Sequence, residues 1–429
     1  MEMTAPPSPA VDDAENPSTQ NHPEWRDGRR FKLGFFTTGL MWTLPWAAAI
    51  QVLLPQRFTD IGVSDPVSLV AQINAVGAVV ALVANLFFGA LSDRSRSRWG
   101  RRTPFMVAGG VVAGVFLVLA YLFTSPLLII VAWSGFQVGL NALLAPFLAT
   151  LSDRVPESNR ATTSALYGIG VSIGVTLGAT VGAVFLKNPG IGFLIGAVIV
   201  AASGVVTAII WPTEGSAEDR PAAEAVNVMD IVRSFTPPTR NARDFYLALL
   251  GRLLIMLAYY MPAGFTLYIL KDYLGLTTEQ AQTVIPLISI PTVLASILAS
   301  AFAGTISDRW GRRKPLVILC AVLVAVGFVI PWLHPTVPAM IASGVIGGLA
   351  LGLYNTAGQA LNVDVLPDPE QAGKDLGVLN LSNTFGQILG PVIAATVYGA
   401  MGSYRPVYLI GAIVALSSIP VIALIRKAR

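Results

Sequence analysis

The sequence predicts an all-α polytopic membrane protein with twelve transmembrane helices, arranged as two parallel-repeat six-helix bundles. Of its 429 residues, 54% are hydrophobic and 12% are charged, and that charged share is roughly half the share in a soluble domain. Apolar stretches of about 20 residues, the length that crosses about 30 Å of hydrocarbon, recur from Phe31 almost to the C-terminus. An internal duplication divides these stretches into two sets of six.

The apolar stretches define the expected helices. Several of them contain Pro or many Gly, which soluble helices rarely tolerate and membrane helices do. The third and fourth stretches are separated only by Thr124 and Ser125. The twelve expected spans are residues 31–54, 67–92, 103–123, 126–150, 161–186, 191–211, 244–271, 280–306, 314–333, 336–364, 374–399 and 404–426.

Polar segments divide the chain into regions. Residues 1–30 are expected to form a disordered cytoplasmic tail, because their first part is rich in Pro, Ser, Thr, Asn and Asp. This tail lacks the apolar region and cleavage site of a signal peptide. Residues 212–243 form the longest polar interruption and are expected to be a cytoplasmic linker. The linker would join an N-terminal bundle at 31–211 to a C-terminal bundle at 244–426.

The basic residues orient the chain. With both termini on the cytoplasmic side, 23 of the 28 Lys and Arg residues lie in or beside cytoplasmic segments, as the positive-inside rule requires. The net charge of +4 is then explained by basic loops that face an anionic leaflet. The expected location is the plasma membrane, as a multi-pass protein, and no nucleic-acid partner is expected.

Two loops carry the same sequence signal. Residues 89–104 read Gly-Ala-Leu-Ser-Asp-Arg-Ser-Arg-Ser-Arg-Trp-Gly-Arg-Arg-Thr-Pro, and residues 304–315 read Gly-Thr-Ile-Ser-Asp-Arg-Trp-Gly-Arg-Arg-Lys-Pro. The two copies are offset by 215 residues at Asp93 and by 211 at Gly100, because the first copy has four extra residues. The chain is therefore duplicated.

A second repeated signal follows the fourth and the tenth span. It reads Asp-Arg-Val-Pro from Asp153 and Asp-Val-Leu-Pro from Asp364. Because six spans return the chain to the side from which it started, the two halves have parallel orientation. Parallel repeats place a substrate site near the midplane, between the halves.

The repeated loops resemble the signature loop of the major facilitator superfamily, Gly-x-x-x-Asp-Arg-x-Gly-Arg-Arg/Lys. The resemblance covers essentially the whole membrane region and implies that superfamily's fold and a transport function. Residues 97–104, with the form Ser-Arg-Trp-Gly-Arg-Arg-x-Pro, and residues 364–380 are similar to the glycoside–pentoside–hexuronide cation symporters and the sucrose-transporter-like branch. This narrower resemblance implies import of a sugar or glycoside together with a proton or a sodium ion.

The repeated loops supply the expected inner gate. In each copy an aspartate at a helix end precedes arginines, in a loop that a glycine allows to turn sharply. Arg160 and Lys374 are the expected cross-loop cations, with Asp153 and Asp364 as their acceptors. Pairs that form in only one state bias a transporter toward that state; the alternative is that they fix only topology and loop shape. The candidate gate residues are Asp93, Arg94, Gly100, Arg101, Arg102, Asp153, Arg160, Asp308, Arg309, Gly311, Arg312, Arg313, Asp364 and Lys374.

Polar and aromatic residues in mid-span form the expected substrate cavity. Such side chains are costly to leave facing lipid, so they should face the interior. Amides exchange hydrogen bonds with hydroxyl groups, and aromatic rings stack on the apolar face of a sugar. The alternatives are hydrogen bonds between helices and, for the tryptophans, ordinary core packing. The candidate cavity residues are Trp42, Trp46, Gln137, Asn141, Tyr167, Arg252, Tyr259, Tyr260, Asn355, Gln359, Asn380, Asn383 and Gln387.

Arg252 is the one charged residue well inside a span. It is expected either to bind an anionic substrate group or a carboxylate partner, or to snorkel toward the inner surface. No Asp, Glu or His lies in the middle third of any span, where proton-coupled carriers usually keep a carboxylate. Cation coupling therefore follows from the resemblance alone, and uniport stays open.

Export of a small organic compound or drug is the alternative function. Glycines at 170, 174, 178 and 182 form a ridge that is expected mainly to pack against another helix, although exporters of the superfamily carry a glycine-rich motif there. An enzyme is not expected, because the lone Cys320 and the distant His22 and His334 make no nucleophile–base pair or metal cluster. The expected protein is a monomer without metal or cofactor, whose partners are a small-molecule substrate, a coupling ion and the bilayer.

Overall fold

The computed structural model describes residues 28–218, 238, 242–310, 313–367 and 372–426. Within these, the side chains of residues 161, 304–310 and 372–374 are not described. The described residues are helical with short connections and contain no strand. The expected all-α fold is thus confirmed; most of the expected tail and much of the expected linker lie outside the described residues.

The N-terminal helices follow the expected spans closely. The first span is continuous but changes from α1 through a π-helical turn, η3, into α2. Outside the continuous first span, four of the helices begin with Pro at their first or second position, where the missing N–H costs nothing. The bounds are α1 Gly28–Ala48, η3 Ala49–Leu53, α2 Leu54–Asp60, α3 Pro66–Asp93, α4 Thr103–Leu122, α5 Pro126–Arg154, α6 Glu157–Val184 and α7 Pro189–Ile210.

The C-terminal helices repeat this order with two further π-helical turns. One of these, η4, closes the seventh segment, and the other, η5, lies inside the tenth. The bounds are α9 Arg243–Tyr260, α10 Thr266–Tyr268, η4 Ile269–Tyr273, α11 Thr278–Trp310, α12 Lys314–Leu333, α13 Val337–Leu353, η5 Tyr354–Gly358, α14 Gln359–Asp364, α15 Ala372–Met401 and α16 Arg405–Ala423.

Eleven helices in the described part of the chain are long and apolar enough to cross a membrane. The remaining expected span, 244–271, is wrong as a continuous helix: α9 ends at Tyr260, and α10 begins at Thr266. Pro262 lies in the break, and Gly264 adopts a φ of 86°, a conformation that L-residues with a side chain rarely adopt. The seventh segment is therefore two helical pieces joined at a bend.

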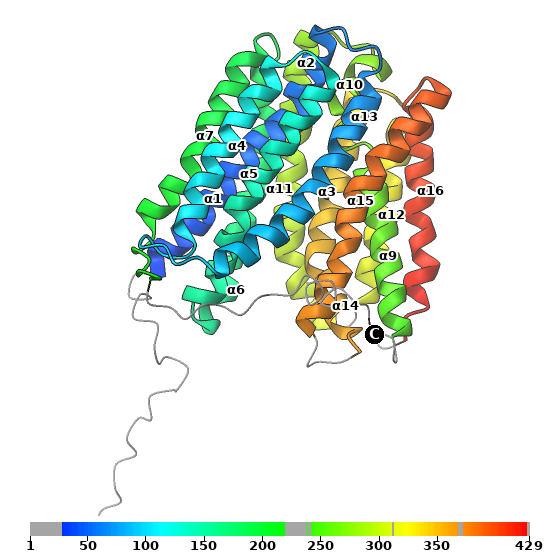
Figure 1. Cartoon of the computed structure of the whole chain (residues 1–429). Coiled ribbons are helices and arrows are strands. Elements are labelled where there is room, and N and C mark those ends of the chain that lie inside the picture. The colour runs from blue at the N-terminus through cyan, green and yellow to red at the C-terminus, as the bar shows by residue number, and fades with distance from the viewer. Residues whose placement is uncertain (1–27, 219–237, 239–241, 311–312, 368–371, 427–429) are drawn as a thin grey trace, which may run out of the picture.

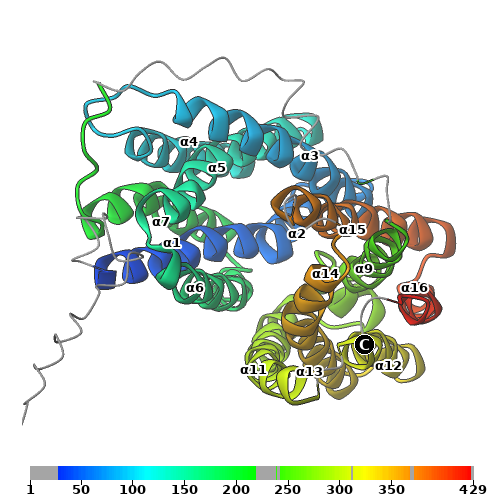
Figure 2. The same cartoon turned by 90° about the horizontal axis from the view of Figure 1, so that it is seen from below.

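The helices form two groups that stand side by side (Figures 1 and 2). Helices α1 to α7 make one group, and α9 to α16 make the other. The groups touch along two seams, α3 against α15 and α6 against α11. We call the face that carries residues 94–102, 153–160 and 313–314 the basic face; it lies at the bottom of Figure 1.

The glycine ridge of α6 packs directly on α1. A Cβ atom added to Gly170 would lie 2.2 Å from the Phe36 carbonyl oxygen, and one added to Gly178 would lie 2.4 Å from the Leu44 carbonyl oxygen. Any side chain here would push the two helices apart. The expected packing role of the ridge therefore accounts for these glycines.

Candidate functional site

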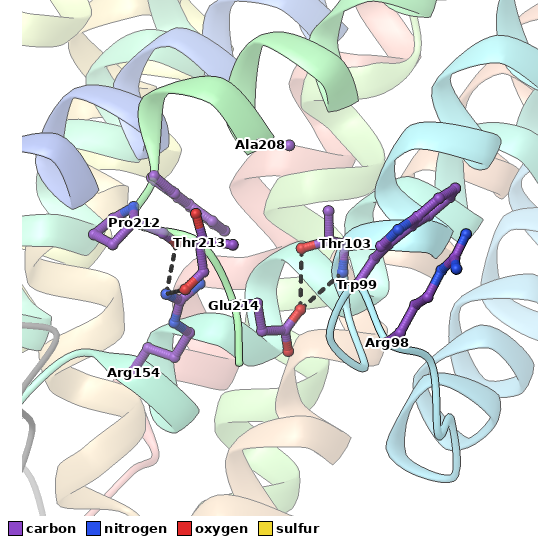
Figure 3. A pocket seen from close by; sticks show the side chains of 9 residues that line it. Arg98, Trp99, Thr103, Arg154, Ala208, Pro212, Thr213 and Glu214 are labelled. Carbon is purple, nitrogen blue, oxygen red and sulfur yellow. Dashed lines mark hydrogen bonds between the residues drawn. The ribbon is translucent and has the colours of Figure 1, made fainter. Parts of the chain in front are cut away.

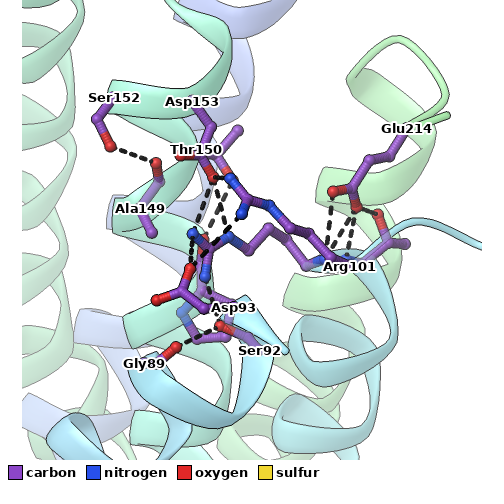
Figure 4. A network of polar contacts seen from close by, with 12 residues as sticks. Gly89, Ser92, Asp93, Arg101, Ala149, Thr150, Ser152, Asp153 and Glu214 are labelled. Atoms are coloured by element: carbon purple, nitrogen blue, oxygen red, sulfur yellow. Dashed lines mark hydrogen bonds and ion pairs between the residues drawn. The ribbon is translucent and has the colours of Figure 1, made fainter. Parts of the chain in front are cut away.

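Arg102 is the centre of an ion-pair network on the basic face. Figure 4 shows this network, with Arg101, Asp93 and Asp153 labelled. Its side chain is buried and lies 2.6 Å from an Asp93 carboxylate oxygen and 2.9 Å from an Asp153 carboxylate oxygen. It also donates to the Ser92 hydroxyl. Because Asp93 ends α3 and Asp153 lies in the last turn of α5, one guanidinium joins two helix ends.

Arg101 supports the same two carboxylates. Its guanidinium lies 2.6 Å from Asp153 and 3.7 Å from Asp93. Asp93 is half exposed, and single exposed pairs contribute about 1 kcal/mol or less. Two arginines shared between two aspartates fix the loop more firmly than one pair would, because each side chain is already held by a neighbour.

Glu214 makes a contact with the first repeated loop that the sequence did not reveal. Its carboxylate accepts hydrogen bonds from the backbone N–H groups of Arg102 and Thr103, at 3.0–3.2 Å, and from the Thr103 hydroxyl at 3.0 Å. It thus caps the start of α4, whose first N–H groups have no partner in the helix. Gly100 makes room for this contact, because its Cβ would lie 2.2 Å from a Glu214 carboxylate oxygen.

A cavity of about 220 Å³ lies beside this cap (Figure 3). Trp99, which is 63% exposed, forms one wall, and the Arg98 guanidinium lies 5.3 Å from its ring centre. On another side, Arg154 donates to the carbonyl oxygens of Pro212 and Thr213 at 2.7 and 3.4 Å. The residues that line the cavity come from the N-terminal bundle and the first residues of the linker, and none comes from the C-terminal bundle, so this cavity does not lie between the two bundles.

The second half has a simpler version of the network. Arg313 pairs with Asp364 and donates to the Ala360 carbonyl oxygen at 2.8 Å. Lys314, at the start of α12, donates to the carbonyl oxygens of Ala423 and Ile425 near the end of α16. Of the remaining candidates here, Gly311 and Arg312 lie outside the described residues, as do the side chains of Asp308, Arg309 and Lys374.

Arg160 forms an ion pair with neither of the expected acceptors, Asp153 and Asp364. Its guanidinium donates instead to the carbonyl oxygens of Val155, at 3.0 Å, and Ser152, at 2.9 Å. The cause is local: α5 ends at Arg154, and the last carbonyls of a helix lack intrahelical partners. Asp153 already forms ion pairs with Arg101 and Arg102.

The candidate gate residue Arg94 follows the last residue of α3. It caps the end of that helix through its backbone N–H.

The candidate cavity residues of the N-terminal half form two small groups. In the first, the rings of Trp42 and Trp46 lie 6.3 Å apart on α1. In the second, the Asn141 side chain donates to the Gln137 carbonyl oxygen at 2.9 Å and accepts from Asn85 of α3 at 3.3 Å. Asn85 was not among the expected residues, because no other amide of α3 lies within two turns of it.

Tyr167 lies in an aromatic cluster rather than in a polar group. Its ring centre lies 5.6 Å from that of Phe147 and 6.5 Å from that of Phe35. Both phenylalanines are fully buried. Packing therefore accounts for most of the environment of this tyrosine.

The candidate residues of the C-terminal half come together between α9 and α15. Arg252 donates to the Asn380 side-chain oxygen at 3.1 Å. About two turns further along, Gln387 donates to the Tyr260 hydroxyl at 3.4 Å. The ring of Tyr259 meets that of Tyr260 edge to face at 5.4 Å.

Three further candidate amides keep accessible surface. Asn355 and Gln359 are exposed although they lie within the tenth segment, and Asn383 is half-buried. The Gln359 side-chain oxygen accepts a hydrogen bond from Asn362 at 3.3 Å. These amides retain donors and acceptors for a ligand.

The family is decided by comparison with known proteins. The family model described as Major Facilitator Superfamily matches residues 31–290 and 248–429, which together cover nearly all described residues. The chain belongs to the Major Facilitator Superfamily.

Other superfamily members show how far the likeness extends. The "Probable metabolite transport protein CsbC" of Bacillus subtilis is 31% identical over 156 residues, which is 36% of this chain and 32% of that protein. Matches to curated relatives span about a third or less of their length. A crystal structure of the nucleoside transporter NupG superposes with a TM-score of 0.72 at 16% identity, covering 93% of this chain and all of that chain.

A second solved structure gives the same fold. It is a bacterial homologue of the human lysosomal transporter Spinster, in an inward-facing and unoccupied conformation. Its TM-score is 0.66 at 14% identity, and the match covers 92% of this chain and 95% of that chain. At these identities the likeness establishes the superfamily fold.

In this Major Facilitator Superfamily chain, the halves are joined at the face opposite the basic face. The Tyr268 hydroxyl donates to the Pro55 carbonyl oxygen at 2.8 Å, and Gln282 donates to the Val184 carbonyl oxygen at 2.9 Å. Buried side chains from both halves pack beside them, namely Val52, Ala179, Ala183, Leu186, Leu267, Leu270, Ala281, Val284 and Ile285. On the basic face, the ion pairs found among described side chains each lie within one half.

Proposed function

We propose that this chain is a secondary active transporter that moves a small polar solute, a sugar or glycoside, by alternating access. The observation that carries the proposal is the contrast between the two faces. Contacts at the face opposite the basic face cross from one half to the other, whereas the described ion pairs of the basic face stay within a half. A transporter needs contacts between its halves that exist in one state and break in the other.

The basic face is proposed to be cytoplasmic, with both termini on that side of the plasma membrane. The support is the distribution of charge, because 23 of the 28 Lys and Arg residues lie in or beside the segments that the sequence predicts on the cytoplasmic side. In this orientation the conformation is inward-facing, with the outer ends of the two halves closed against each other. In this conformation Arg101, Arg102 and Arg313 hold each inner loop in shape, and a gating role would require contacts across the halves in the opposite conformation.

A sugar-like substrate is supported by the side chains available in mid-span. The amides Asn355, Gln359 and Asn383 keep accessible surface, and each can donate and accept hydrogen bonds. Aromatic rings accompany the amides in both halves, as the pairs Trp42–Trp46 and Tyr259–Tyr260. This mixture suits a solute with many hydroxyl groups and one apolar face.

We further propose that transport of the solute is coupled to a cation. Its support is the resemblance of residues 97–104 and 364–380 to cation symporters of the sugar-transporting branch. Asp272 is a candidate coupling group, because it is a carboxylate near the outer closure that accepts a hydrogen bond from Tyr398 at 3.3 Å. A proton or sodium ion bound there would change the charge beside the closed contacts between the two halves.

Uptake by proteoliposomes tests the function. Vesicles containing the full chain are offered a panel of labelled sugars under imposed proton or sodium gradients. We expect gradient-stimulated uptake of at least one sugar, a loss of tenfold or more in Asn383→Ala, and no loss in Asn188→Ala, which alters an exposed loop amide. Silence toward every sugar, together with dye extrusion from cells that express the chain, would instead identify an exporter.

A further inference from the structure

Arg252 is a buried charge whose hydrogen bonding is incomplete. Its side chain lies in α9, and the residue is 6% exposed. One terminal nitrogen donates to Asn380, and the guanidinium lies 6.0 Å from the ring centre of Tyr354. Its Nε–H is buried without an acceptor. Among the side chains that the structure describes, no carboxylate forms an ion pair with it.

Snorkelling does not explain this position. Arg252 is the tenth residue of α9, which places it about 13 Å from the basic end of that helix. Asn380 is the ninth residue of α15, at nearly the same depth of about 12 Å. The hydrogen bond between them therefore runs sideways between two helices at mid-depth, rather than along α9 toward the surface.

An arginine keeps its charge inside proteins, and a buried charge is costly unless it is paired and hydrogen-bonded. The neutral Asn380 oxygen satisfies one N–H and leaves the charge itself unpaired. The resting protein therefore retains a cation that an anion could neutralise. Burial would make that pairing stronger than it is in water.

The hydrogen-bond partner of this cation keeps accessible surface. Asn380 is exposed, so the hydrogen-bond partner of Arg252 borders open space. Tyr354 is held in the π-helical turn η5, and such turns occur frequently at functional sites. A Cβ at Gly358 would lie 2.9 Å from the Tyr354 ring, so this glycine makes room for the ring beside the guanidinium.

We propose that the transported solute carries one anionic group, a carboxylate or a phosphate, which docks on Arg252 beside Asn380. The inference rests on the proposed transport function and narrows it to organic anions that also carry hydroxyl groups. The anionic group accepts from the free Nε–H and from a terminal N–H, as charge-assisted hydrogen bonds from arginine to carboxylate or phosphate commonly do. The amides and tyrosines toward the outer side contact the hydroxylated remainder.

Matched ligand sets test the proposal. The purified full chain is assayed with sets such as glucitol, gluconate and glucitol 6-phosphate, in which neutral, carboxylate and phosphate members share one carbon chain. Two readouts are used: uptake into proteoliposomes, and the ligand-induced rise in melting temperature. We expect an anionic member of at least one set to be taken up tenfold or more faster than its neutral counterpart. Whether the carboxylate or the phosphate member is taken up faster then identifies the anionic group.

Variants assign the preference to Arg252. Arg252→Gln should abolish the anion-to-neutral ratio in both readouts, whereas Arg405→Gln, which removes an equal charge from an exposed site, should leave the ratio unchanged. If Arg252→Gln does not fold, Arg252→Lys replaces it. This variant keeps the charge but lacks Nε–H, and it should lower the apparent affinity for the anion about tenfold and leave the neutral member unaffected.

Some results would overturn the inference and leave the proposed function standing. Uptake of neutral members alone would do so, as would an anion preference that survives in Arg252→Gln. If no member is taken up, the proposed function fails, and the melting temperatures then decide on the anion site. If anions raise the melting temperature of the unmodified protein but not that of Arg252→Gln, the anion site is supported. If anions raise neither melting temperature, or raise both equally, the anion site is overturned.

Discussion

Single side chains on the basic face show which parts of the site a sequence can reveal. Asp93 and Asp153 could be found, because equivalent aspartates recur in the second half of the chain. Both aspartates form ion pairs with Arg102, and in the second half the equivalent Arg313 pairs with Asp364. Glu214 could not be found, because it lies 112 residues from Arg102. The repeat gives no hint of it either, since Lys314, which holds the position of Thr103 in the second half, donates to main-chain carbonyls instead.

Removing the Glu214 carboxylate should loosen the start of α4. Glu214→Ala leaves two backbone N–H groups and the Thr103 hydroxyl without their acceptor, which should cost about 1–3 kcal/mol. We expect a lower melting temperature in detergent and reduced uptake. Glu218→Ala is the control, since Glu218 is exposed; equal melting temperatures for the two variants would contradict the capping role.

At the scale of elements, apolar length predicted the helices better than their interruptions. The segment expected at 244–271 bends because Pro262 and Gly264 fall within it. Most other residues of the bend are apolar, so hydropathy did not mark it. The three π-helical turns are likewise invisible in hydropathy, since one extra residue in a turn changes no composition. Helix faces that carry amides at helical spacing were easier to predict. Asn380 and Gln387 were expected on one face of the same helix, and both donate to or accept from residues of α9.

The close contact between α6 and α1 gives a prediction for an element. Gly178→Ala places a methyl group 2.4 Å from the Leu44 carbonyl oxygen, and such overpacking typically costs about 1–3 kcal/mol. We expect a lower melting temperature and slower uptake. Gly168→Ala is the matched control on the same helix, because nothing lies within 4 Å of its added Cβ. A variant at 178 as stable as the one at 168 would mean that the helices are free to separate.

At the scale of the molecule, the fold was predictable because independent signals agreed. Span length, the one-sided distribution of charge and the repeated loops all indicate two parallel six-helix halves, and the superfamily model matches along the same region. The closed face was not predictable, because two transport states share their helices and differ by only a few kcal/mol. The expected ion pair of Arg160 was missed for a local reason instead, since the end of α5 offers main-chain carbonyls to its guanidinium and two other arginines already pair with Asp153.

Cross-linking the closed face tests alternating access most directly. The Gln282 side chain lies 2.9 Å from the Val184 carbonyl oxygen across the two halves, so Val184→Cys and Gln282→Cys can be joined by a short reducible cross-linker. The native Cys320 is buried, and each single variant treated with the same reagent serves as the control. We expect cross-linking to abolish uptake of the solute into proteoliposomes and reduction to restore it. Uptake that continues unchanged in the fully cross-linked protein would contradict the account.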